Sequence, residues 1–204
     1  MSKALTGLGA TTIAALVVGL SACGGSSSDS PKPKLAGLQA KPQVPAPPLR
    51  LRDSLRKPVN ISNYRGKAVL VTFIYTHCPD VCPLIVGHLH SALATLGPAA
   101  SKLQIIAVST DPIGDTPKTV KKFLAAHEMT GKMQYLIGSR PNLERVWKAW
   151  NIVVHPPKGP NAPDVVEHSA EVYGIDASGK ITTVYPANFQ PRTIVHDVPL
   201  LASQ

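Results

Sequence analysis

Apolar residues along this 204-residue chain follow two kinds of pattern. Continuous apolar runs, such as Ala68–Tyr75 and Leu103–Ser109, are typical of strands buried on both faces of a sheet. Apolar residues at i, i+3, i+4 and i+7, as in the stretch from Leu143 to Trp150, predict a helix with one buried face. The alternation of the two patterns predicts an α/β domain. In order, the expected elements are strand Ala68–Tyr75, helix Pro83–Leu96, strand Leu103–Ser109, a helix opened by Thr116 and Pro117, strand Met133–Ile137, a helix around Leu143–Trp150, a β-hairpin of His168–Asp176 and Ile181–Tyr185, and a last helix from about Pro191.

The first residues have the features of an export signal. Residues 1–22 contain Lys3, an apolar stretch too short to span a bilayer, and small residues just before Cys23. The sequence Leu20-Ser21-Ala22-Cys23 resembles the lipobox of bacterial lipoproteins. That resemblance implies that Cys23 is lipidated and becomes the first residue of the mature chain, anchored to a membrane of the bacterial cell envelope and facing the periplasm or the cell exterior. An ordinary secretory signal that leaves Cys23 as a plain thiol is the alternative.

The following segment, residues 23–48, is rich in Gly, Ser and Pro and has few large apolar side chains. Such a composition cannot bury a core, and it predicts a disordered tether. Residues 49–204 have the length of a single domain. The formal net charge of +9 is spread over scattered basic residues without a basic-aromatic stripe, so we do not expect a nucleic-acid partner.

Cys78 and Cys82 lie where the first buried strand gives way to a helix. A thiolate is stabilised and partly exposed at the positive end of a helix, so this pair suits either redox exchange or binding of a soft metal ion. Pro79 and Pro83 push the residues before them away from helical angles, which predicts a loop at Cys78 and a helix that begins at Pro83 with Cys82 as its cap. Chemistry at the first strand-to-helix junction, together with the order of elements, predicts a thioredoxin-like fold, with a central mixed β-sheet flanked by helices and a β-hairpin near the C-terminus.

Two sulfurs leave a copper or zinc ion under-coordinated, so a third ligand is needed. His168 is the favoured histidine because it follows a long proline-rich loop and starts a strand that a thioredoxin fold brings against its cysteines. His77 leaves its strand on the face opposite Cys78, and we expect it at most to tune the site. His88 and His90 imitate a zinc-binding spacing, but a helix that begins at Pro83 directs His88 away and places His90 too far along its axis.

Three motifs in order resemble the Sco/SenC copper chaperones of cytochrome c oxidase assembly. They are T-F-I-Y-T-H-C-P-D-V-C-P, then Ser109–Pro117, then Val166–Lys180. The resemblance implies that Cys78, Cys82 and His168 bind copper as Cu(I) and Cu(II). It also implies that the protein delivers copper to the binuclear copper site of oxidase subunit II, or reduces the cysteines of that site, after receiving copper or electrons from an upstream copper donor or thiol reductant.

Acidic residues also fall on positions of this family. Glu167 stands where many members carry aspartate before the histidine, which keeps the charge. Asp80 is expected to be an outer carboxylate of the site or a partner contact, and Asp115 a structural residue at a helix start. Asp111 also falls on a family position.

Other functions of the same fold remain open. A thiol-disulfide oxidoreductase could use Cys78 and Cys82 as a redox-active pair. A thiol peroxidase is disfavoured, because the motif lacks the expected lone cysteine after a proline/threonine turn and the nearby arginine. A purely structural disulfide rarely needs an exposed strand-to-helix junction.

Overall fold

The computed structural model describes residues 34–155 and 167–204. The expected signal, Cys23 and the first part of the expected tether lie outside these residues. The described part contains one eight-stranded mixed sheet in the order β1-β10-β9-β4-β5-β6-β2-β3 and a two-stranded sheet of β7 and β8. The strands are β1 Leu38–Pro45, β2 Arg50–Asp53, β3 Pro58–Asn60, β4 Ala68–Ile74, β5 Leu103–Ser109, β6 Gln134–Ile137, β7 Val154–His155, β8 Glu167–His168, β9 Glu171–Ile175 and β10 Lys180–Pro186.

The centre of the sheet is parallel and both of its flanks are antiparallel. Strands β4, β5 and β6 run parallel, with Ala68 paired to Leu103 and Ile74 to Ser109. On one side β9 pairs antiparallel with β4, followed by β10 and β1. On the other side β2 pairs antiparallel with β6, and β3 with β2. Every residue of β4 is buried, which confirms the interpretation of that apolar run.

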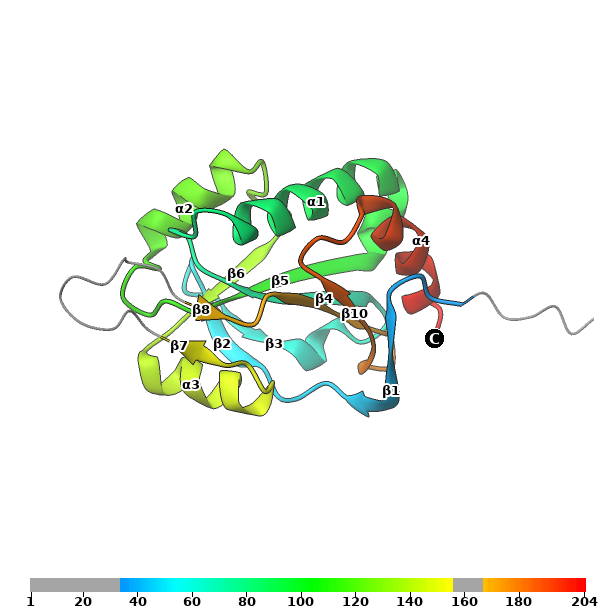
Figure 1. Ribbon diagram of the computed structural model, residues 1–204, viewed down its shortest axis with the longest axis horizontal. Coiled ribbons are helices and arrows are strands. Elements are labelled where there is room, and N and C mark those ends of the chain that lie inside the picture. Colours follow the sequence, from blue (N-terminus) through cyan, green and yellow to red (C-terminus); the bar gives the residue numbers. More distant parts are fainter. Residues whose placement is uncertain (1–33, 156–166) are drawn as a thin grey trace, which may run out of the picture. The chain divides into compact units, whose positions relative to one another are not determined.

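Helices cover both faces of the sheet (Figure 1). One hydrophobic core contains the buried residues of α1, α2 and α4, and a second core on the other face contains those of α3. The four buried positions of the predicted stripe, from Leu143 to Trp150, all belong to the second core. The helices are α1 Val81–Leu96, α2 Pro117–Ala126, α3 Arg140–Ala149 and α4 Pro191–Leu201, with 3₁₀ helices at Ile61–Tyr64 and Gly97–Lys102.

Helix α1 begins earlier than expected. It starts at Val81, so Cys82 lies in its first turn and Asp80, not Cys82, is the N-cap. Pro83 is tolerated there because the N–H groups of the first turn have no intrahelical partner. The apolar stretch Val81–Lys102 is long enough to cross a membrane, but six of the α1 side chains are buried in the core of the domain.

The folded part also begins earlier than residue 49. Residues 38–45 form β1, an edge strand that pairs antiparallel with β10, so the expectation of a disordered tether up to residue 48 is wrong for this segment. Its composition misleads because most of its side chains are exposed and because edge strands tolerate proline, here Pro42 and Pro45. The expected C-terminal hairpin is present as β9 and β10, whereas His168 lies in the separate strand β8, which pairs with β7.

Candidate metal centre

The cysteine pair lies at the carboxyl end of β4, where the chain turns into α1. Cys78 precedes the helix, and its N–H donates to the carbonyl of Tyr75 at 3.4 Å. Cys78 is 8% exposed and Cys82 is fully buried. Both side chains belong to the core between α1 and the sheet, so the expected partial exposure of the thiols is wrong.

The two thiols form an asymmetric pair. The backbone N–H of Cys82 donates to Cys78 Sγ at 3.3 Å. A hydrogen bond from the Cys82 thiol, with further help from backbone N–H groups, lowers the pKa of Cys78 to about 6 despite its burial. The same thiol-thiol bond, together with burial, strongly raises the pKa of Cys82. At neutral pH the pair therefore carries one thiolate, on Cys78, with the proton on Cys82.

His168 reaches this pair from β8. Its Nε2 lies 3.9 Å from Cys82 Sγ. The Nδ1 atom lies 2.7 Å from the carbonyl oxygen of Ser169, which can only accept, so Nδ1 carries the proton and Nε2 is left with a lone pair. Burial lowers the pKa of His168, which keeps the ring neutral. The edge contact with the ring of Tyr75, at a centroid distance of 5.8 Å, further fixes the imidazole.

The spacing of these donors fits a shared ion. A sulfur at about 2.3 Å and a nitrogen at about 2.0 Å from one ion, roughly 120° apart, lie about 3.7 Å from each other. The Cys82–His168 distance of 3.9 Å is close to this value. Among the described residues, no three His, Cys, Asp or Glu side chains are already grouped to hold an ion. Cys78 is instead engaged with Cys82, whose thiol donates a hydrogen bond to it.

The other predicted site residues lie at the rim. His77 and Asp80 are both exposed. His77 Nδ1 lies 3.3 Å from the hydroxyl of its neighbour Thr76. Asp80 makes no capping hydrogen bond through its side chain, although its backbone N–H helps to lower the pKa of Cys78. Four other described histidines contact other groups: His88 packs on Phe189, His90 lies near Glu128, His127 packs on Phe123, and His196 contacts Asp197. His155 is exposed in β7.

Two contributions to the site were missed in the sequence. Tyr75, within the cysteine motif, contacts the His168 ring, and its place three residues before Cys78 is the signal that could have revealed it. Asp115 directly precedes α2, whose N-cap is Thr116, as expected, in a capping box with Thr119. Asp115 accepts a hydrogen bond from the N–H of Thr76, on the approach to the cysteines.

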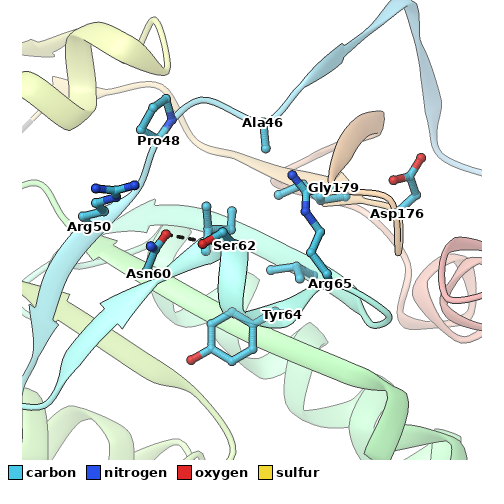
Figure 2. Close-up of a pocket in the computed structure, with 12 residues that line it drawn as sticks. Ala46, Pro48, Arg50, Asn60, Ser62, Tyr64, Arg65, Asp176 and Gly179 are labelled. Atoms are coloured by element: carbon cyan, nitrogen blue, oxygen red, sulfur yellow. Dashed lines mark hydrogen bonds between the residues drawn. The ribbon is translucent and has the colours of Figure 1, made fainter.

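A separate cavity of about 170 Å³ lies on the other face of the sheet (Figure 2). Val69 and Ile175, from the second core, line it together with Arg50 and Arg65. Arg65 extends towards the turn at Gly179 and donates to the carbonyl of Ser178. No cysteine or histidine lines this cavity, so it is not part of the candidate metal centre.

Comparisons with known proteins agree on one family. A family model described as SCO1/SenC matches residues 39–203. The SCO1 protein homolog of Bacillus subtilis is 28% identical over 141 residues, which are 68% of this chain and 72% of that protein. The mitochondrial protein SCO2 of Saccharomyces cerevisiae is 28% identical over 149 residues, which are 72% of this chain but 49% of that protein, so the match spans about half of this relative.

Solved structures show the same fold. ScoI of Bradyrhizobium japonicum with copper bound has a TM-score of 0.69 and 26% identity, and the match covers 78% of this chain and 99% of that one. Apo Sco1 of Thermus thermophilus has a TM-score of 0.71 and 25% identity, with 84% and 99% covered. The thioredoxin-like fold expected from the order of elements is therefore confirmed.

Proposed function

The chain belongs to the SCO1/SenC family, and from this premise we propose that it is a copper-binding assembly factor of cytochrome c oxidase. Copper is its cargo, and the ligands are Cys78, Cys82 and His168. The ScoI structure from Bradyrhizobium japonicum, which has copper bound, supports the choice of metal.

The single observation that carries this proposal is the approach of His168 Nε2 to Cys82 Sγ, at 3.9 Å, with the lone pair of the nitrogen free. Thiolate and imidazole are donors that copper accepts in both oxidation states. Cys78 is already a thiolate at neutral pH, because its pKa is about 6. Binding the ion therefore requires the loss of one proton, from Cys82.

We further propose the setting in which the cargo moves. Lipidation of Cys23 holds the domain at the membrane of a bacterial envelope, and the copper passes to the binuclear site of oxidase subunit II. The partner approaches the buried cysteines, Cys78 and Cys82, from the side where His77 and Asp80 are exposed. The lipid anchor is tested by Cys23→Ser, which should move the protein from the membrane fraction to the soluble fraction.

The difference in pKa between the Cys78 and Cys82 thiols also favours a second function, which is reduction of a partner's disulfide. The Cys78 thiolate attacks one sulfur of that disulfide, and the other sulfur leaves as a thiolate and takes up a proton. Cys82 then loses its proton and attacks Cys78 in the mixed disulfide, which leaves a Cys78–Cys82 disulfide and a reduced partner dithiol. The low pKa of Cys78 suits the first step. The raised pKa of Cys82 comes mainly from its hydrogen bond to Cys78, which is lost once Cys78 is in the mixed disulfide, so deprotonation of Cys82 becomes easier for the second step.

Copper titration of the reduced protein separates the two functions. The full chain with Cys23→Ser, in detergent, should bind about one equivalent of copper and show Cu(II) charge-transfer bands. His168→Ala should remove these bands, while His127→Ala, on α2's C-terminal end, should leave them unchanged. Unchanged spectra in His168→Ala reject His168 as a ligand. Failure of the parent protein to bind copper, with turnover on a disulfide substrate retained in His168→Ala, favours the reductase.

A further inference from the structure

Asp115 is a buried carboxylate that accepts hydrogen bonds from three different strands or their ends. It is 5% exposed. Its Oδ1 accepts from the backbone N–H of Thr76 at 2.9 Å. Its Oδ2 accepts from the hydroxyl groups of Ser109 at 2.7 Å and Tyr135 at 2.9 Å. Thr76 follows β4, Ser109 ends β5 and Tyr135 belongs to β6, so one side chain connects the three parallel strands.

These bonds fix the part of the chain that leads to the cysteines. Thr76 is two residues before Cys78. The carbonyl of Ile74, at the end of β4, accepts in addition from the N–H of Thr110 at 3.0 Å, and the Tyr135 hydroxyl, whose single proton is shared with Asp115, lies 3.2 Å from it. The exit of β4 is thus held by bonds to residues of β5 and β6, and its position depends in part on Asp115.

The carboxylate has no cation beside it in the described part of the chain. The ion pairs found there join His90 to Glu128, Arg140 to Glu144 and His196 to Asp197. Burial raises the pKa of Asp115, whereas the hydrogen bonds from Ser109, Thr76 and Tyr135 lower it, so these donors favour the charged form. Both oxygens accept hydrogen bonds, which an amide with its single acceptor oxygen could not reproduce. The carboxylate lies close to the site, because Thr76, from whose N–H it accepts, is two residues before Cys78.

We propose that Asp115 is a positioning residue for the cysteine pair, which fixes the strand end before Cys78 and whose negative charge favours bound Cu(II) over Cu(I). The inference rests on the proposed copper function. Its physical basis is that the attraction between a carboxylate and an ion grows with the charge of the ion, and that it is weakly screened in a buried site.

A matched control lies elsewhere in the same fold. Asp197 on α4 is also fully buried and accepts hydrogen bonds from the backbone N–H groups of Ala36 and Gly37 and from the hydroxyl of Tyr185. It holds the N-terminal segment of the domain instead of the cysteine loop. Loss of either carboxylate removes bonds to backbone N–H and tyrosine hydroxyl groups, and Asp197 also loses its contact with His196. A merely structural role therefore predicts at least as large an effect for Asp197.

The test compares Asp115→Asn with Asp197→Asn in the full chain carrying Cys23→Ser. Competition with chelators measures the affinities for Cu(I) and Cu(II) separately. We expect Asp115→Asn to lower the Cu(II) affinity about tenfold more than the Cu(I) affinity, which makes the copper potential about 59 mV more positive. Asp197→Asn should lower the unfolding midpoint and leave the ratio of the two affinities unchanged. An unchanged ratio in Asp115→Asn, or an equal change in both variants, overturns the proposal.

Tyr135→Phe provides a second variant in case Asp115→Asn fails to fold. The Tyr135 hydroxyl donates to Asp115 and lowers the pKa of that carboxyl, so its loss favours the neutral acid. We therefore expect a smaller shift of the same sign as in Asp115→Asn, with the preference for Cu(II) lowered about twofold. Tyr185→Phe, which removes the corresponding donor of Asp197, should change nothing at the site. A rise in the Cu(II) preference of Tyr135→Phe contradicts the proposal.

The dithiol potential of Cys78 and Cys82, measured against glutathione, distinguishes this inference from the proposed function. Absence of copper binding by the parent protein rejects the proposed function. In that case Asp115→Asn should still make the dithiol more oxidising, because the thiolate of the reduced form no longer faces a negative charge, whereas Asp197→Asn should not. An unchanged dithiol potential in Asp115→Asn rejects the positioning role as well.

Discussion

His168 Nε2 lies 3.9 Å from Cys82 Sγ, although 86 positions separate the two residues in the chain. The sheet brings them together: β9, which follows His168 closely, pairs with β4, which leads to Cys78. The short pairing of Val154 with His168 then holds the histidine strand over the end of β4. The separation of the donors in sequence means that the site exists only when the domain is folded.

The His168 ring should be neutral and protonated at Nδ1. The carbonyl of Ser169 fixes this tautomer, and burial lowers the pKa of the ring below its usual value of 6.5. Nitrogen-15 NMR of the imidazole should therefore show an unprotonated Nε2 at pH 6.5, where an exposed histidine is half charged. Addition of Cu(I) should shift the Nε2 signal and leave Nδ1 protonated. A ring that is protonated at Nε2 would contradict the assignment of this atom as a ligand.

Cys82→Ala should make Cys78 much less reactive. In the parent protein Cys78, with a pKa of about 6, is mostly thiolate at pH 7. Without the hydrogen bond from the Cys82 thiol its pKa rises towards 9, so the rate of alkylation by iodoacetamide at pH 7 should fall about tenfold or more. The rate is measured as a function of pH under reducing conditions, with Cys23→Ser in both proteins. A parent profile with its midpoint near pH 9 would show that the thiol-thiol bond is absent.

The central fold could be predicted from the sequence because its signals are local. The apolar run of β4 and the stripe of α3 each indicate burial within one element, and Thr116 before α2, with Pro117 at its first position, marks the start of that helix. Strands β2 and β3 escaped prediction because they contain only four and three residues. Strand β1 escaped because its stability depends on pairing with β10 and not on its own apolar content.

The sequence predicted which residues meet at the candidate site but not what surrounds them. Cys78 and Cys82 are visible as a pair at a strand end, and His168 follows from fold position and family resemblance. The burial of both thiols and the hydrogen bonds of Asp115 arise from the packing of β5, β6 and α1 around them. Such contacts between distant segments leave no periodic signal in the sequence.

The stability of the reduced protein should pass through a maximum near pH 9. The pKa of Cys78 is lowered in the folded state, so its contribution is present above the unfolded value of 9 and is lost as the pH falls towards 6. The pKa of Cys82 is raised, so above pH 9 the unfolded thiol ionises while the folded one does not, and stability falls again. The slope on the acid side should be a fraction of the ceiling of about 1.4 kcal/mol per pH unit for one proton. Urea unfolding at pH 6, 7.5, 9 and 10 measures the free energy of unfolding as a function of pH. The double variant Cys78→Ala/Cys82→Ala is the control, and it should lack the maximum.

A chain that begins at residue 49 should be less stable than one that begins at residue 34. Removal of β1 exposes the edge of β10 and deprives the buried carboxylate of Asp197 of the N–H groups of Ala36 and Gly37. Hydrogen bonds to charged groups contribute about 1.5–3 kcal/mol each, so the loss should be about 3 kcal/mol or more. Thermal unfolding of the two fragments measures the difference in stability. Asp197→Asn in the longer fragment should cause part of the same loss of stability. Equal unfolding temperatures for the two fragments would mean that residues 34–48 are a tether after all, and that the folded domain starts where composition alone places it.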